Sequence, residues 1–314
     1  MSGGALRDVI VTCPPMLGQL PLFEDLAAGR GLRLHPARTT QILSEDELKA
    51  LVPLYDGWII GDDPATHAVF AAGQAGRLRA AVKWGIGVDN VDFDACRALG
   101  IPVINTPQMF GAEVADVATA YLIGLARHLF EIDRGVRAGG WPKPAGISLA
   151  GRRAGVVGLG DIGRATCARL MAHGLAVTAY DPGVAGDAGL PGLSRAPWPE
   201  AVGTLDFLVF TCALNARNFH MLDAGVLAQA KPGIRIVNVA RGPLIDEAAL
   251  VAALASGQVH SAALDVFEVE PLPAASPLRE HPRCIFGSHN SSNSVDAVIR
   301  ASHRAIDAMA GFLA

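Results

Sequence analysis

The chain is poor in cysteine and has no cysteine motif. Its five cysteines are odd in number and widely scattered, and none forms a CxxC pair. This argues against a disulfide framework and against a cysteine-based zinc site, and it is typical of reduced thiols in a cytoplasm. We therefore expect a cytoplasmic protein that holds no metal. The cysteines are Cys13, Cys96, Cys167, Cys212 and Cys284.

The chain also lacks an excess of one charge and any long apolar run. Lys and Arg number 26 against 30 Asp and Glu, which gives a formal net charge of −4. With no basic run either, we expect no nucleic-acid partner and no attraction to an anionic membrane. Apolar stretches are broken by Asp, Arg, Gly or Pro before they reach the length of a membrane span. The first residues, MSGGALRDVIVTCPP, lack the apolar stretch of a signal peptide, so we expect none.

What the chain does have is enough apolar residues for two cores. Of its 314 residues, 51% are hydrophobic and 18% are charged, and this length suits two domains better than one. Short β-branched runs alternate with helical patterns, which predicts βαβ units and parallel sheets. We expect two doubly wound α/β domains. The expected strands are 8–13, 32–35, 57–61, 78–84 and 101–105 in the first series, then 154–158, 176–181, 207–211, 234–239, 261–265 and 284–287.

A glycine pattern follows the first strand of the second series. Gly158, Gly160 and Gly163 have the GxGxxG spacing, with an apolar strand before them and a helix-compatible run after them. In such a turn the glycines permit a tight bend, close approach to a pyrophosphate, and close packing of helix on strand. The helix N-terminus then offers N–H groups and a positive dipole end to the phosphates. Alone, the pattern is weak evidence, because a glycine-rich turn can lack a function.

The acidic residue that completes this pattern is also present. The next expected strand ends at Asp181, 23 residues after Gly158. A carboxylate there can accept hydrogen bonds from both ribose hydroxyls and would repel a 2′-phosphate. Strand, turn, helix and acid in this order predict a dinucleotide site that prefers NAD to NADP.

Three further polar motifs follow later strands of the same series. They are VNVARGP with Arg241, ALDVFEVEP with Asp265, Glu268 and Glu270, and GSHNSS with His289. Because ligands lie beyond the carboxyl ends of the strands in an open parallel sheet, we expect these residues to converge on the cofactor. Arg binds a carboxylate bidentately, and His exchanges a proton near neutral pH. A carboxylate behind the His would fix its tautomer and stabilise the imidazolium, and on residue type alone either glutamate could do so.

The motifs together resemble those of the D-isomer-specific 2-hydroxy acid dehydrogenase family, which includes phosphoglycerate, glycerate, lactate and formate dehydrogenases. The similarity is carried by GLGDIG, VNVARGPLIDEAAL, ALDVFEVEP, the late histidine, VKWGIGVDNVDF and IPVINTP, and it covers about residues 81–289. The resemblance implies NAD-dependent hydride transfer between the nicotinamide and C2 of a D-2-hydroxy acid or 2-keto acid. From Lys83 and the polar residues Asn290, Ser291, Ser292 and Asn293 after the histidine, we expect a phosphorylated acid such as 3-phosphoglycerate as the first candidate substrate, with glyoxylate or hydroxypyruvate as the alternative.

The resemblance also implies roles for individual residues. Arg241 matches the substrate-binding arginine, Glu270 the carboxylate that pairs with the histidine, and His289 the acid–base histidine. Asp265 matches the residue that contacts the nicotinamide carboxamide. The backbone of Gly85, Ile86 and Gly87 matches the loop that binds the substrate carboxylate. The implied cofactor-binding set is Gly158, Gly160, Asp161, Ile162, Gly163, Asp181, Thr211, Cys212, Ala240 and Asp265.

Some positions depart from the family pattern and bear on the substrate. Asp161 adds a negative charge to the glycine turn and should weaken phosphate binding. Lys83 stands where some relatives with phosphorylated substrates have Arg, so we expect it at the rim of the pocket, facing a phosphate or second carboxylate. The alternative is a solvated lysine at a strand end. Trp84 either lines the pocket or belongs to the core. The expected substrate-binding set is Lys83, Trp84, Gly85, Ile86, Gly87 and Arg241.

The resemblance further implies two domains and a homodimer. We expect residues 1–103 and 293–314 to form a flavodoxin-like substrate domain, and residues 104–292 to form the Rossmann NAD-binding domain. The apolar helix expected at 112–130 packs on a second subunit in relatives, and Trp141 resembles an aromatic that crosses that interface. A rival interpretation from another class is a non-catalytic NAD-binding regulator built on the same fold.

Overall fold

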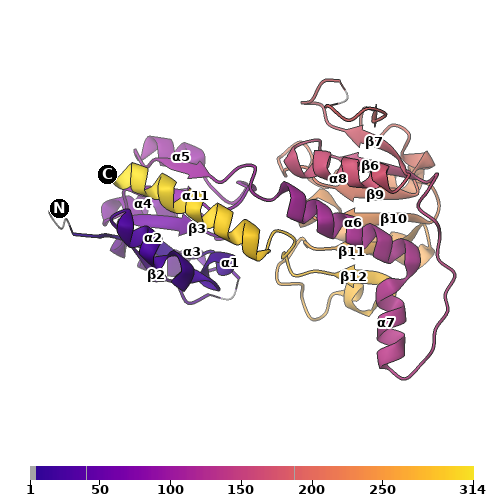
Figure 1. Cartoon of the computed structure of the whole chain (residues 1–314), viewed down its shortest axis with the longest axis horizontal. Coiled ribbons are helices and arrows are strands. Elements are labelled where there is room, and N and C mark those ends of the chain that lie inside the picture. The colour runs from indigo at the N-terminus through magenta and orange to yellow at the C-terminus, as the bar shows by residue number, and fades with distance from the viewer. Residues whose placement is uncertain (1–4, 40, 187) are drawn as a thin grey trace. The chain divides into compact units, whose positions relative to one another are not determined.

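The computed structural model describes residues 5–39, 41–186 and 188–314. Residues 1–4, with which the first expected domain begins, lie outside the described residues. The chain divides into two compact units: Met1–Phe110 with Asn293–Ala314, and Gly111–Ser292 (Figure 1). Among the described helices, none combines the length and apolarity that crossing a membrane requires.

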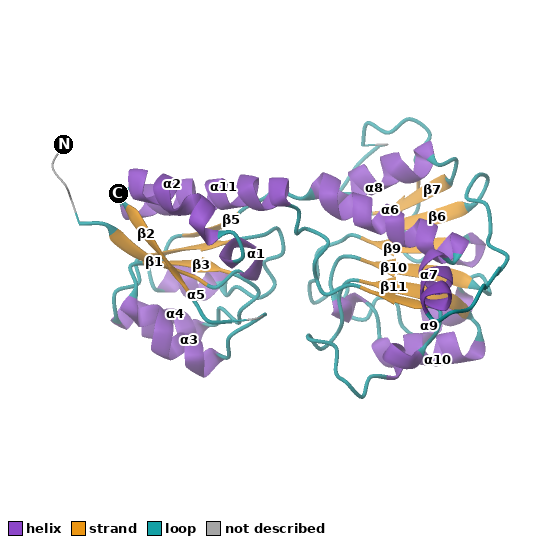
Figure 2. Ribbon diagram, turned by 60° about the horizontal axis from the view of Figure 1, so that its bottom comes forward, coloured by secondary structure: helices purple, strands orange, loops and turns teal. Residues whose placement is uncertain are grey.

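The first unit contains a five-stranded, fully parallel sheet in the order β2-β1-β3-β4-β5. This is the flavodoxin-like order, as expected, with its switch point between β1 and β3. Helices cover both faces, with α2 and α11 on one side and α3 and α4 on the other (Figure 2). The strands are β1 (Arg7–Val11), β2 (Leu32–Pro36), β3 (Gly57–Ile60), β4 (Ala80–Lys83) and β5 (Val103–Asn105). The α-helices are α1 (Pro14–Leu17), α2 (Glu24–Gly29), α3 (Glu45–Leu51), α4 (His67–Ala75), α5 (Phe93–Ala98) and α11 (Val295–Leu313).

Burial on both faces explains why β3 is an unbroken apolar run. Every residue of β3 and β4 is buried. Helix α3 begins at the expected capping box, in which Ser44 and Glu47 bond each other's backbone N–H. Helix α11 packs close to β3, since a Cβ added at Gly57 would collide with the side chain of Met309.

The second unit contains a seven-stranded parallel sheet in the order β12-β11-β10-β9-β6-β7-β8. Numbered within the unit, this is the Rossmann order extended by one strand, with its switch point between β6 and β9. Helices α6 and α8 cover one face, and α9 and α10 cover the other (Figure 2). The strands are β6 (Arg153–Val157), β7 (Ala176–Tyr180), β8 (Ser194–Arg195), β9 (Phe207–Phe210), β10 (Ile234–Asn238), β11 (Val259–Leu264) and β12 (Cys284–Phe286). The α-helices are α6 (Gly111–Arg127), α7 (Leu129–Arg137), α8 (Asp161–Ala172), α9 (Ala224–Gln229) and α10 (Glu247–Ser256).

The structure differs from the expected elements at three places. The single helix expected at 112–130 is two helices, because His128 adopts a left-handed backbone conformation with φ 56° between α6 and α7. Strand β5 pairs with β4 in the first sheet, so the chain enters the second unit after this strand and not at residue 104. The two-residue edge strand β8 is too short to leave a sequence pattern.

Candidate active site

The glycine turn lies between β6 and the N-terminus of α8, at the switch point of the second sheet. A Cβ at Gly158, which has φ 96°, would collide with the backbone of Cys212, and one at Gly163 would collide with the carbonyl of Gly158. Both positions therefore require glycine for internal packing. A Cβ at Gly160 would meet no atom within 4 Å, so the space over the helix N-terminus is open. Open space before unsatisfied helical N–H groups fits the pyrophosphate of a dinucleotide.

Asp181 follows β7 and its carboxylate is held beside this turn. One oxygen accepts the N–H of Leu159 at 2.7 Å, and the other accepts the N–H of Gly183 at 2.8 Å. Each carboxylate oxygen has a further lone pair, so the group can also accept ribose hydroxyls. The guanidinium of Arg195 bonds the backbone carbonyl of Asp181, not its carboxylate.

Asp161, the unusual residue of the turn, packs against the start of α6. A Cβ at Gly111 would collide with the Asp161 carboxyl group. A carboxylate at a helix N-terminus is favourably placed in the dipole of that helix. Asp161 therefore has a structural contact with α6, in addition to its expected place at the phosphates.

The carboxyl end of β9 contributes Thr211 and Cys212 to the same corner. The Thr211 hydroxyl lies 3.0 Å from the carbonyls of both Val157 and Gly158 and so ties β9 to the glycine turn. Burial raises the pKa of Cys212 to about 12. The thiol is therefore protonated at neutral pH, as expected for a residue that is not a nucleophile.

Arg241 lies in a tight turn after β10 that Asn238 shapes. The Asn238 amide donates to the carbonyl of Arg241 at 2.9 Å, and its oxygen accepts the N–H of Ala240 at 3.0 Å. A Cβ at Gly242 would collide with the backbone of Phe267, so this turn packs directly on the segment after β11. Asn238 is a positioning residue that the sequence analysis missed, although it stands within the quoted motif.

Asp265, at the end of β11, organises the loop that carries His289. Its carboxylate accepts the N–H of Asn290 at 3.2 Å and both the N–H and the hydroxyl of Ser291, at 2.9 Å and 2.5 Å. Its backbone carbonyl accepts the N–H of His289 at 2.7 Å. These bonds hold His289 in a left-handed conformation with φ 55°, which is uncommon for a non-glycine residue.

His289 pairs with Glu270. Nδ1 of the ring lies 2.8 Å from Oε2 of Glu270, whose other oxygen accepts the N–H of Phe267 at 2.9 Å. A carboxylate at Nδ1 fixes the tautomer and leaves Nε2 as the nitrogen for proton exchange with a substrate. The two side chains are 22% and 24% exposed, so the pair is accessible yet sheltered.

Glu268, the alternative partner, has other contacts. Its Oε1 lies 3.0 Å from Nε2 of His220 and accepts the N–H of Glu247 at 2.8 Å. Together with Asp246, these side chains form a separate polar cluster, in which the ligating atoms of His220, Asp246 and Glu268 lie within 4.8 Å of one another. The geometry thus selects Glu270 over Glu268 as the partner of His289.

In the first unit, the expected carboxylate-binding loop follows β4. Gly85 has φ 128°, a conformation suited to glycine, and its N–H is taken by the Thr106 hydroxyl at 2.8 Å. The N–H groups of Ile86 and Gly87 have no protein acceptor within the part of the chain that the structure describes. Two adjacent unpaired amides suit a carboxylate. The N–H of Gly85 is already bonded to Thr106, so Gly85 contributes only the backbone conformation of the loop.

The structure contradicts the expected place of Lys83 at a pocket rim and selects the core for Trp84, for which both places were open. Lys83 is 1% exposed, and its ammonium donates to the carbonyl of Gly61 at 2.5 Å and to Asp62 at 2.9 Å. It is therefore neither an exposed phosphate ligand nor a solvated lysine. Trp84 is 5% exposed, bonds Ser302 at 3.1 Å and packs on Phe110, so it belongs to the core.

Comparison with known proteins agrees with these features. Residues 119–291 match the model of the family described as "D-isomer specific 2-hydroxyacid dehydrogenase, NAD binding domain". The chain is 36% identical over 258 residues to D-3-phosphoglycerate dehydrogenase of Mycobacterium leprae, which covers 81% of this chain and 48% of that protein. The chain thus spans about half the length of the curated relatives that it matches first.

Two further likenesses cover more of the matched protein. Hydroxypyruvate reductase of Thermotoga maritima is 34% identical over 236 residues, which are 74% of this chain and 76% of that enzyme. Among solved structures, the TT0316 protein of Thermus thermophilus superposes with a TM-score of 0.86 at 29% identity, over 98% of this chain and 96% of that one.

Proposed function

The chain belongs to the D-isomer-specific 2-hydroxyacid dehydrogenases, and we propose that it is an NAD-dependent enzyme that interconverts a small 2-keto acid and its D-2-hydroxy acid. The observation that carries this proposal is the 2.8 Å pair of His289 and Glu270, which shares one sheet edge with Arg241 and the glycine turn. The reaction needs three parts, which are an oriented imidazole, a guanidinium group and a turn that binds the dinucleotide.

Each residue has a defined task in the proposed reaction. Arg241 binds the substrate carboxylate. Bound NADH supplies the hydride. In reduction, Nε2 of His289 gives a proton to the developing alkoxide, and in oxidation it takes the hydroxyl proton. Glu270 holds the ring and stabilises its protonated form through Nδ1.

For the substrate we propose a short, unphosphorylated 2-keto acid such as hydroxypyruvate or glyoxylate. The phosphorylated candidate was based on Lys83, whose ammonium is buried against Asp62 and Gly61. The relatives of M. leprae and T. maritima are named for 3-phosphoglycerate and hydroxypyruvate, so both acids belong in the test. Initial rates of NADH oxidation with glyoxylate, hydroxypyruvate, pyruvate and 3-phosphohydroxypyruvate decide between them. Turnover of none of these acids would favour a non-catalytic NAD-binding regulator.

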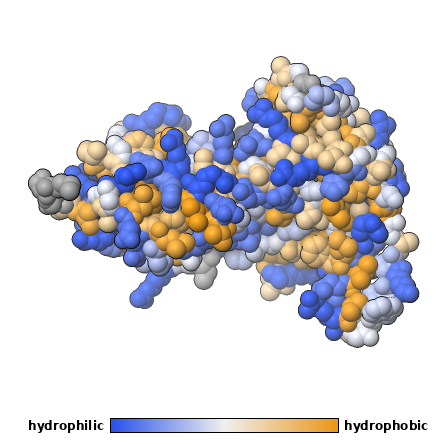
Figure 3. Space-filling model, in the orientation of Figure 1, coloured by the Kyte–Doolittle hydropathy of each residue, from blue (hydrophilic) through white to orange (hydrophobic). Residues whose placement is uncertain are grey.

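We also propose a homodimer in the cytoplasm. The apolar face of α6 is buried within its own unit, so the argument from that helix no longer requires a partner. Exposed apolar side chains gather instead on α7 and the loop after it: Leu129 is 49% exposed, Phe130 40%, Val136 43% and Trp141 77%. Figure 3 shows apolar residues over the region of α7. Such side chains are suited to an interface with a second copy. The five free cysteines are compatible with a reducing compartment.

A further inference from the structure

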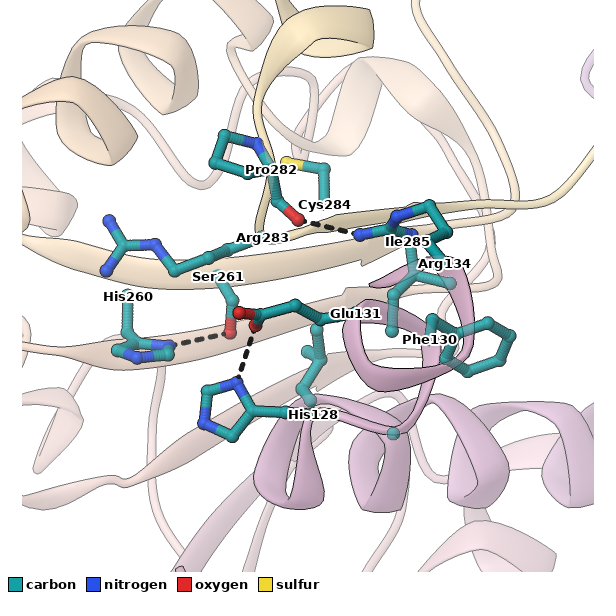
Figure 4. Close-up of a pocket in the computed structure, with 12 residues that line it drawn as sticks. His128, Phe130, Glu131, Arg134, His260, Ser261, Pro282, Arg283, Cys284 and Ile285 are labelled. Atoms are coloured by element: carbon teal, nitrogen blue, oxygen red, sulfur yellow. Dashed lines mark hydrogen bonds and ion pairs between the residues drawn. The ribbon is translucent and has the colours of Figure 1, made fainter. Parts of the chain in front are cut away.

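A hollow in the second unit lies at the amino ends of β11 and β12, the opposite strand ends from those that lead to Glu270 and His289. It has a volume of about 260 Å³, including the part open to solvent, and its lining includes His128, His260, Ser261 and Arg283. Figure 4 shows the ring of His260 turned toward Ser261, and Arg283 on the segment that leads into β12. Nothing in the proposed reaction uses these residues.

Arg235 does not line the hollow but lies close enough for its charge to act on His260 and Arg283, and its Nε is buried without a hydrogen-bonding partner among the described residues. It is 9% exposed, and its Nε is buried with no hydrogen bond within the described residues. Its position on β10 pairs with Ser261 of β11, so the two side chains share one face of the sheet. The protein contact of its guanidinium is the ring of Phe207, whose centroid lies 5.7 Å from Cζ. Burying an unpaired guanidinium is costly, which points to a ligand that supplies the missing acceptors.

The charges around Arg235 are mostly positive. Asp206 is the nearest carboxylate to act on it, but this carboxylate already pairs with Arg152 at 3.4 Å and with Lys231 at 2.7 Å. On the other side of the hollow, Glu131 is paired with His128 at 2.9 Å. The carboxylates of this region are thus engaged, whereas Arg235 and Arg283 form no ion pair within the described residues.

The pKa of His260 is lowered by its burial and by the positive charges around it. A bulge in the β10–β11 pairing leaves His260 without a partner residue on β10, and the hydroxyl of Ser261 lies 3.0 Å from its Nδ1. Burial, then the charges of Arg235 and Arg283, lower the pKa of His260 to about 4, while Glu131 acts weakly in the opposite sense. The ring of His128, 5.8 Å away, also lowers it.

We propose that this hollow binds a small oxyanion, with Arg235 and Arg283 as its charged ligands and the Ser261 hydroxyl as a further donor. Phosphate and a small carboxylate share this chemistry, because guanidinium groups bind the oxygens of either in pairs. Occupancy would give the buried Nε of Arg235 an acceptor and would neutralise the charge excess at the amino end of the sheet.

The test is titration calorimetry with inorganic phosphate against potassium chloride of equal ionic strength, with the glycine turn saturated by NADH. We expect one saturable site per chain in phosphate. Arg235→Met and Arg283→Ala should each raise Kd at least about tenfold, equivalent to about 1.4 kcal/mol. Arg38→Ala, which removes an exposed arginine from the first unit, should leave Kd within about twofold. Repeating the titration with sulfate, a tetrahedral oxyanion, and with succinate, a carboxylate, shows which of the two classes of anion the site prefers.

Several results would overturn the proposal. One is heat no greater than that of chloride, and another is an equal Kd in the wild type and both arginine variants. A third is phosphate binding that occurs without NADH and not in the NADH-saturated protein, which would place the ion in the glycine turn. Failure of phosphate to bind, combined with a weaker dimer in Arg283→Ala, would show that a carboxylate of a second copy fills the hollow. Because Arg283 precedes β12 and is only half-buried, its variant keeps the test valid if Arg235→Met folds poorly. None of these readouts depends on turnover of a keto acid.

Discussion

Nδ1 of His289 lies 2.8 Å from Oε2 of Glu270, while Glu268, two residues away, faces His220. Because the two glutamates have different partners, a variant of Glu268 can serve as the control for a variant of Glu270. Glu270→Gln removes the negative charge that stabilises the protonated imidazole, so the alkaline limb of the rate of keto-acid reduction should move to lower pH. Glu268→Gln should leave that limb in place. Profiles of kcat/KM against pH for the two variants provide the measurement, and an unmoved limb in Glu270→Gln would contradict the assignment.

Asp181 should set the preference for NADH over NADPH. Its carboxylate sits at the carboxyl end of β7, where it would repel a 2′-phosphate. Asp181→Ala should weaken NADH binding by about tenfold and improve NADPH binding, since the carboxylate that accepts the ribose hydroxyls and repels a 2′-phosphate is removed. Kd values from NAD(P)H fluorescence measure the effect, and Asp133→Ala on α7 serves as the charge-matched control. A wild type that binds NADPH more tightly would refute the prediction.

Lys83 should act on stability and not on substrate choice. Lys83→Met removes the bonds that the buried ammonium donates to the carbonyl of Gly61 and the carboxylate of Asp62, which should lower the free energy of unfolding by about 1–3 kcal/mol. Exposed Lys49→Met should change it by less than about 0.5 kcal/mol. Urea denaturation gives both values. If Lys83→Met instead raised KM about tenfold for 3-phosphohydroxypyruvate alone and left stability unchanged, the original role as a phosphate ligand would be restored.

The apolar side chains of α7 should hold two copies together. Light scattering is expected to give twice the chain mass of 32.6 kDa. Val136→Glu should shift the protein toward monomer, because a charge in an apolar interface is costly to desolvate. Leu22→Glu, at an exposed leucine of the first unit, should leave the dimer intact. A monomeric wild type at micromolar concentration would rule out this interface.

Much of the fold was predictable because its signals are local. Gly158, Gly160 and Gly163 mark a turn whose packing demands are met within a few residues, and Asp181 ends the strand beside it. Alternating strand and helix patterns predicted both sheets. The break at His128 was not predictable, since the residues around it remain compatible with one continuous helix.

The errors in the candidate site come from tertiary contacts. Lys83 and Trp84 directly precede the expected carboxylate-binding loop, yet their side chains bond Asp62 and Ser302, which are distant in sequence. Burial of a lysine depends on a partner that no local pattern reveals. Arg235 is a second example. It lies in a strand, and nothing in the local sequence indicates that its Nε is buried without a hydrogen-bonding partner among the described residues.

The most direct test of the proposed function is keto-acid reduction by His289→Ala, measured together with NADH binding. General acid–base catalysis by a histidine contributes about 10²–10⁴-fold, so kcat with the best acid of the panel should fall by that factor. NADH Kd should stay within about twofold, since the glycine turn and Asp181 are untouched. Arg241→Ala should likewise leave NADH binding intact and chiefly raise KM. A His289→Ala enzyme with kcat within about threefold of the wild type would contradict the account.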